Sequence, residues 1–228
     1  MGCCQAQVVA PRTPVHSAEH HFQKAESFLG LAAVKTEEAS STLRRLASGH
    51  AITQAQLVKA FAKLQLDTSF FERFSSAKCR FFEGFTLGPR TYSVAKLETL
   101  FVLLGSAPVS VKADSLFSAY DGGCTQALDY ESVLGLFEDI IDISVWLVGK
   151  LALERCPQAE CDIKAYMCLL GAQRKSLSHF FSQLLFYTQG AGVGRAAFLR
   201  SFGDRAFNKL LRPASVRELA YEFFLMRT

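Results

Sequence analysis

The sequence of 228 residues lacks the features that identify membrane-spanning or secreted proteins. No apolar run approaches the roughly 18 residues that a membrane span requires. The best candidate, Val133 to Leu153, is interrupted by Glu138, Asp139, Asp142 and Lys150. No apolar segment near the start is typical of a secretory signal. We therefore expect any contact with a membrane to be made from the cytosolic side, through the N-terminus.

The motifs of common metal sites and enzymes are also missing. The seven cysteines form neither a C-x-x-C pair nor a disulfide framework, so we predict free, buried thiols in a reducing compartment. No G-x-x-x-x-G-K-[ST] phosphate loop occurs. His179 lies among Ser176, Ser178 and Ser182, but neighbours in sequence do not establish a catalytic triad. We predict that the protein is not an enzyme.

The composition is that of a folded protein with a large core. Half of the residues are apolar, 20 are phenylalanine, and 20% are charged, with a net charge of +4. From Arg195 to Arg217 apolar residues are interleaved with basic ones, but the segment lacks the dense basic face of a nucleic-acid-binding protein. Two interpretations of this region stay open: a solvated basic face over a core stripe, or a contact with anionic lipid or an acidic protein.

The apolar pattern is helical almost throughout. Apolar side chains recur at spacings of three and four, as at Leu97, Leu100, Phe101 and Leu104. Period-two alternation is scarce, so we predict an all-α fold of about ten helices. Four helix starts are marked by a capping residue after a large apolar one: Ile52-Thr53, Tyr92-Ser93, Leu128-Asp129 and Val193-Gly194. Thr53 and Gln56 have the spacing of a capping box.

The N-terminus has the pattern of a lipid anchor. Gly2 presents the amine that N-myristoylation needs once Met1 is removed, and Cys3 and Cys4 lie where palmitoylation commonly follows. One myristoyl chain binds a membrane only marginally, so a second chain is needed for a stable anchor. Ala6 departs from the motif, which has Ser or Thr at the sixth residue. Residues 1–17 are therefore expected to be an acylated tether.

A unit of helix, short turn, apolar residue, cap and helix recurs along the chain. Its apolar residues, at Ile52, Tyr92, Leu128 and Val193, are separated by 40, 36 and 65 residues. This pattern resembles the EF-hand superfamily, and with the MGCC start it is similar to acylated calcium sensors of the recoverin type and to acylated EF-hand proteins of protist flagella. The resemblance implies two lobes of paired helix-loop-helix units, at residues 18–106 and 107–228. Extra helices are expected at about residues 142–175, with a break at Pro157. Short strand contacts are expected between Ile52 and Tyr92, and between Leu128 and Val193.

The calcium ligands of that family are largely absent. Calcium needs six to eight oxygens, normally with Glu at loop position twelve and Gly at position six. The twelfth positions hold Gln56, Lys96, Ser132 and Ala197. The third loop keeps Asp121, Thr125 and Asp129 as vestigial oxygen donors and has Gln126 at the glycine position. We expect no bound metal or cofactor, with calcium as the only alternative.

We therefore predict a non-enzymatic, lipid-anchored adaptor that binds a partner protein without calcium. The partner is expected to be a helix that lies in a groove of one lobe. The protein is expected to be peripheral, on the cytosolic leaflet of a membrane, with no nucleic-acid partner. Two alternatives stay open: a structural component of a cytoskeletal, axonemal or flagellar assembly, and a calcium sensor that uses the third loop.

Overall fold

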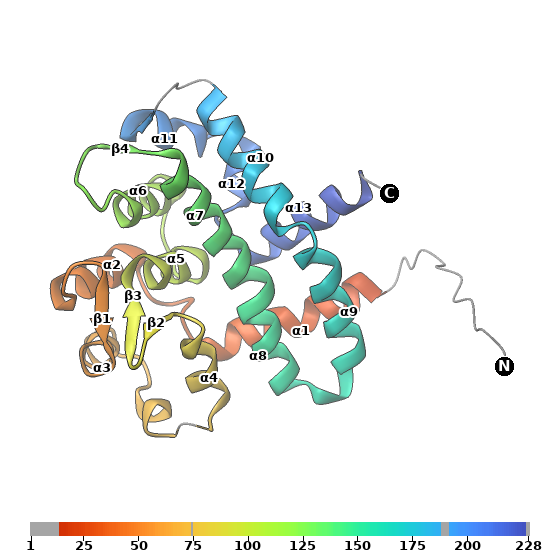
Figure 1. The fold of residues 1–228 in the computed structure, drawn as a ribbon. Coiled ribbons are helices and arrows are strands. Elements are labelled where there is room, and N and C mark those ends of the chain that lie inside the picture. The colour runs from red at the N-terminus through yellow and green to blue at the C-terminus, as the bar shows by residue number, and fades with distance from the viewer. Residues whose placement is uncertain (1–13, 74, 188–191, 227–228) are drawn as a thin grey trace.

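The computed structural model describes residues 14–73, 75–187 and 192–226, and these are mostly helical (Figure 1). The first half contains α1 (Pro14–Leu29), α2 (Thr36–Leu46), β1 (Ala51–Thr53), α3 (Gln54–Lys63), the 3₁₀ turn η1 (Ser69–Glu72), α4 (Ala77–Glu83), β2 (Thr86–Gly88), β3 (Thr91–Ser93) and α5 (Val94–Leu104). The second half contains α6 (Val109–Tyr120), β4 (Ala127–Leu128), α7 (Tyr130–Ile141), the π-helix η2 (Asp142–Leu147), α8 (Val148–Arg155), the 3₁₀ turn η3 (Pro157–Ala159), α9 (Glu160–Gly171), α10 (Arg174–Tyr187), β5 (Val193–Gly194), α11 (Arg195–Ser201), α12 (Arg205–Lys209) and α13 (Pro213–Leu225). The predicted all-α class is confirmed.

The helix starts lie where the capping residues predict them. Thr53 and Gln56 form the reciprocal capping box of α3, in which the Thr53 amide lies 2.8 Å from Gln56 Oε1. Ser93 Oγ accepts the Lys96 amide at the start of α5, and Asp129 Oδ1 accepts the Ser132 amide at the start of α7. These side chains bond amides that a first helical turn leaves without a partner.

The two predicted strand contacts are present. β1 pairs antiparallel with β3, with Ile52 opposite Tyr92, and β4 pairs antiparallel with β5, with Leu128 opposite Val193. Each pair joins two loops that are far apart in sequence. The hairpin of β2 and β3 adds a third strand to the first sheet, which the sequence did not predict.

The extra helices expected between residues 142 and 175 are also present. α7, η2 and α8 follow one another directly and cross the centre of the molecule (Figure 1, green to teal). Most of the side chains of η2 are buried, so the apolar run from Val133 to Leu153 is a core helix. Pro157 follows α8 and begins η3, and α9 comes next. None of the helices in the described part of the chain is long and apolar enough to cross a bilayer.

The boundary between the two predicted lobes falls between α5 and α6, but the buried side chains on its two sides form one cluster. α1, which belongs to the predicted first lobe, packs on α8 and α9. It begins at Pro14, inside the predicted tether of residues 1–17, and proline is favoured in the first turn of a helix.

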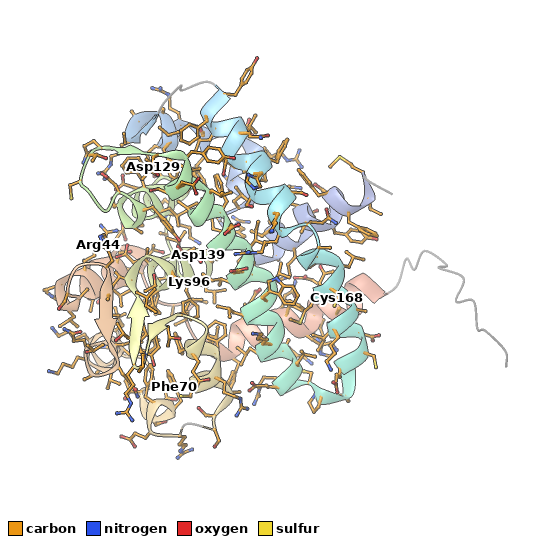
Figure 2. All side chains as sticks on the ribbon, viewed as in Figure 1. Arg44, Phe70, Lys96, Asp129, Asp139 and Cys168 are labelled. Carbon is orange, nitrogen blue, oxygen red and sulfur yellow. The ribbon has the colours of Figure 1, made fainter. Side chains whose placement is uncertain are left out.

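Aromatic rings account for much of the core near α3 and α4. Phe61 lies with its ring centroid 5.2 Å from that of Phe82, 5.7 Å from Phe71 and 6.1 Å from Phe101. Phe70, labelled in Figure 2, stacks on Phe82 at 5.4 Å. Edge-to-face and offset pairs at these separations add to the free energy that burial contributes.

A buried ion cluster joins the first and last helices. Arg217 of α13 has no exposed surface. Its Nε lies 2.8 Å from Glu19 Oε2, and its Nη1 lies 2.7 Å from Glu26 Oε1, both carboxylates belonging to α1. Nη1 also donates to the Ser144 carbonyl at 2.9 Å, and the guanidinium lies over the Phe22 ring. Arg217 was predicted within a basic segment, but it is a core residue because α1 supplies two carboxylates.

Candidate functional site

The predicted vestigial calcium loop lies between α6 and α7. Asp121 follows the last residue of α6 and is 9% exposed. Its Oδ1 accepts the Thr125 amide at 2.8 Å, and its Oδ2 accepts the Gln126 amide at 3.0 Å. The Thr125 hydroxyl lies 3.1 Å from Asp121 Oδ1 and 2.7 Å from the Ala127 carbonyl. Hydrogen-bond donors of the loop itself therefore bond to the Asp121 carboxylate, which would be the first calcium ligand.

The Asp129 carboxylate also accepts a hydrogen bond from a backbone amide. Its carboxylate caps α7, at 2.8 Å from the Ser132 amide, and this bond lowers the pKa of Asp129. Asp121, Thr125 and Asp129 line one surface hollow of about 590 Å³, and Figure 2 labels Asp129 where the loop leads into α7. Among the described residues, no three His, Cys, Asp or Glu side chains gather into a possible metal site.

The loop is held in place by a neighbour and by unusual backbone. A Cβ on Gly122 would lie 2.5 Å from His50 Cε1, so the loop before β1 packs directly on the loop after α6. Cys124 and Gln126 adopt left-handed φ angles of 51° and 60°, and Arg90 of the β2–β3 turn adopts 55°. This conformation costs a residue with a side chain roughly 1–2 kcal/mol, so the surrounding bonds must impose it.

The residues at the twelfth loop positions serve the fold. Gln56 closes the capping box of α3, and Ala197 is buried in α11. Lys96 Nζ lies 3.3 Å from Asp139 Oδ1, and the two side chains meet near the centre of Figure 2, where α5 and α7 pack. The Tyr120 hydroxyl donates to the same carboxylate at 2.7 Å. Burial raises the pKa of Asp139, although Lys96 opposes the shift.

A groove of about 500 Å³ lies between α2 and α6. It is lined by small polar, charged and apolar residues: Glu37, Ser40, Ser41, Arg44, Ser110, Val111, Asp114, Ser115, Ser118 and Leu199. Two of the charged side chains that line it, Arg44 and Asp114, are paired within the chain. Arg44 (Figure 2) bonds the fully buried Glu98, with Nε at 2.8 Å from Oε1, and Arg195 Nε lies 2.8 Å from Asp114 Oδ1.

Apolar side chains are exposed on α10 and at the end of α13. Phe180, Leu184 and Tyr187 follow one face of α10, with exposed fractions of 44%, 42% and 90%. Met226, directly after α13, is 72% exposed. The Phe180 and Phe223 ring centroids are 5.0 Å apart, so the two helices form one surface. We call it the α10–α13 face.

The sequence did not lead us to the groove or to the α10–α13 face. The spacing of Phe180, Leu184 and Tyr187 is a helical stripe, but Leu177, Phe181 and Leu185 of the same helix are buried. The sequence does not show which of two apolar stripes faces the core. The groove depends on α2 lying beside α6, which is a tertiary contact.

Other predicted residues can now be placed. Gly2, Cys3 and Cys4 lie outside the described residues. The five described cysteines are free, as predicted, but only Cys79 and Cys156 are buried, whereas Cys124, Cys161 and Cys168 are exposed. Ser178 and Ser182 bond carbonyls of their own helix, and His179 Nδ1 lies 3.0 Å from the Tyr130 hydroxyl.

Neither a protein-family model nor a curated protein sequence matches this chain.

Proposed function

We propose that this protein is a lipid-anchored, non-enzymatic adaptor of EF-hand-like build that binds a partner protein without calcium. The observation that carries the proposal is the state of the third loop. The Asp121 and Asp129 carboxylates accept amides of their own loop and helix, so the two helices beside the loop are held without a metal.

The loop geometry supports the EF-hand-like part. The residues that the resemblance places at loop position eight are those that pair across the two short sheets, Ile52 with Tyr92 and Leu128 with Val193. At position six, where the family has a glycine for a sharp turn, Arg90 and Gln126 both have left-handed φ angles. The turn is kept although the glycine is not.

Lys96 and Asp121 support independence from calcium. Calcium would have to displace the Thr125 and Gln126 amides from Asp121, and it would gain no carboxylate from a twelfth position. Lys96 stands at the twelfth position of the second loop, where the family has a carboxylate ligand. Its ammonium group is a cation and pairs with Asp139, so it cannot serve as a calcium ligand.

The groove between α2 and α6 is our candidate for the partner's docking place. Five serines line it, and such small side chains let a partner helix approach closely. Val111 and Leu199 supply apolar contact. Arg44 and Asp114 are paired within the chain, so a partner needs no charge to compensate these two side chains. The Ser40 hydroxyl is buried and has no hydrogen-bond partner, so a bound polar group would satisfy it.

Cell fractionation tests the anchor. Changing Cys3 and Cys4 to Ser should move the protein from the membrane to the soluble fraction, because one acyl chain binds only marginally. The matched control changes the exposed cysteines Cys161 and Cys168 to Ser and should leave the protein on membranes. If the Cys3 and Cys4 variant stays on membranes as firmly as the parent, the anchor is wrong. If the parent resists detergent but is released by salt, the protein is instead a cytoskeletal component.

Site-specific photo-crosslinking tests the groove. A photoreactive residue at Ser118, in the groove, should capture one partner, whereas the same residue at Ser27, exposed on α1, should not. Substituting Ser41 with Trp should then abolish the Ser118 crosslink, because the larger side chain fills the groove. Identical products from Ser118 and Ser27 would show that the groove is not the docking place.

A further inference from the structure

The α10–α13 face gathers most of the large apolar side chains that are exposed in the described part of the chain. Six such side chains are exposed in the described part of the chain, and four of them, Phe180, Leu184, Tyr187 and Met226, lie on this face. Contiguous exposed apolar surface marks a site of contact with another protein or with a membrane.

We propose that the α10–α13 face is the surface on which the protein lies against a lipid bilayer. This inference rests on the proposed anchor, and it adds to that proposal the part of the folded body that touches the lipid.

The position of the anchor favours lipid over a protein partner. α1 begins on the side of the molecule where α13 ends (Figure 1), and Arg217 ties the two helices together through Glu19 and Glu26. The twelve residues from Gly2 to Thr13 span at most about 43 Å. Acyl chains on this tether would therefore enter the bilayer within about 43 Å of the start of α1.

The charges and side-chain types on α10 also suit a bilayer surface. α10 contains Arg174 and Lys175 and no carboxylate, and the Lys175 side chain is exposed near the start of the helix. The carboxylates of Glu218 and Glu222 on α13 are each within 3.3 Å of Lys209 Nζ, which offsets their repulsion of anionic lipid. Tyr187 ends the stripe, and tyrosine is enriched where apolar lipid meets water.

Flotation with vesicles tests the face separately from the anchor. The full chain, purified without acylation, is mixed with vesicles of phosphatidylcholine and phosphatidylserine. A variant with Leu184, Tyr187 and Met226 changed to Ser should lower the partition coefficient on the order of tenfold, because three apolar side chains no longer leave water. The control, Leu87→Ser, removes an equally exposed apolar side chain from the β2–β3 hairpin and should change nothing. Circular dichroism of each variant establishes that the fold is retained.

A second measurement reports contact directly. Tyr187→Trp should be quenched by brominated lipid, and Leu87→Trp should not, with the parent's single Trp146 as background. Failure of the parent to float, or equal flotation of the triple variant, overturns the inference while leaving the Cys3 and Cys4 anchor standing. If the parent is a dimer in sedimentation and the triple variant a monomer with unchanged flotation, the face joins two copies of the chain and the inference is wrong.

Discussion

The buried ion cluster of Arg217, Glu19 and Glu26 gives the sharpest test of how this fold is held together. Changing Arg217 to Met keeps most of the apolar stem but removes the cation that pairs with Glu19 and Glu26 among the described residues. Breaking a buried pair costs about 3–5 kcal/mol, because the remaining charge is left without compensation. For a chain of this length, that loss corresponds to a fall of about 6 to 20 °C in melting temperature.

The loss should depend on pH. Burial raises the pKa of Glu26, and Arg217 opposes that shift, so removing Arg217 should raise the pKa further. A carboxyl with a raised pKa in the folded state binds more protons there than in the unfolded chain. The stability that protonation of Glu26 contributes is therefore complete below the pKa of Glu26 in the unfolded chain. It is lost as the pH rises through the pKa of Glu26 in the folded protein. Arg217→Met should consequently destabilise the protein less at pH 5 than at pH 8.

Urea denaturation at the two pH values measures both effects. The control Arg205→Met removes an exposed arginine and should change the free energy of unfolding by no more than about 0.5 kcal/mol. Adding Glu19→Gln and Glu26→Gln to Arg217→Met removes the uncompensated charges and should recover part of the loss. A loss below about 1 kcal/mol, or an equal loss at both pH values, would refute the electrostatic explanation.

Two further predictions concern the loop and a half-buried cation, Lys112. The melting temperature should be the same in calcium and in chelator. Asp121→Ala should lower the free energy of unfolding by about 1–3 kcal/mol, because the Thr125 and Gln126 amides lose their acceptor. A calcium-dependent rise in melting temperature that Asp121→Ala abolishes would show a working sensor. Burial lowers the pKa of Lys112 to about 8, so its folded-state penalty is complete below pH 8 and disappears above its unfolded value. Lys112→Met should therefore stabilise the protein at pH 7, by at most about 3 kcal/mol, and the gain should fade toward pH 10.5 in urea denaturation; a gain that is the same at both values would contradict the prediction.

The features that the sequence predicted well are those decided by nearby residues. Thr53 and Gln56 are three residues apart, so their capping box is visible in the sequence and present in the fold. The break at Pro157 is local for the same reason, because proline lacks an amide hydrogen. The strand pairs are the exception, since Leu128 and Val193 are distant in sequence and were paired only through the resemblance.

The features that the sequence did not predict depend on distant partners. Arg217 looked like one basic residue among several until α1, 198 positions away, supplied Glu19. Lys96 was expected only as an unsuitable loop residue, yet it joins α5 to the carboxylate of Asp139 on α7. The presence of a charged residue in the sequence does not show whether its side chain is solvated or paired in the core. Both water and an opposite charge stabilise the ionised group.

The same ion cluster bears on the two proposals together. If the tether holds α1 near a bilayer, any tilt of α1 is passed to α13, because Arg217 is bonded to carboxylates of α1 and to the Ser144 carbonyl of the central helix. The α10–α13 face and α1 then approach the lipid as one rigid unit. The groove between α2 and α6 is lined by neither α10 nor α13, so it stays open to a partner while that face is covered. An adaptor needs this separation between the surface that holds it in place and the surface that binds.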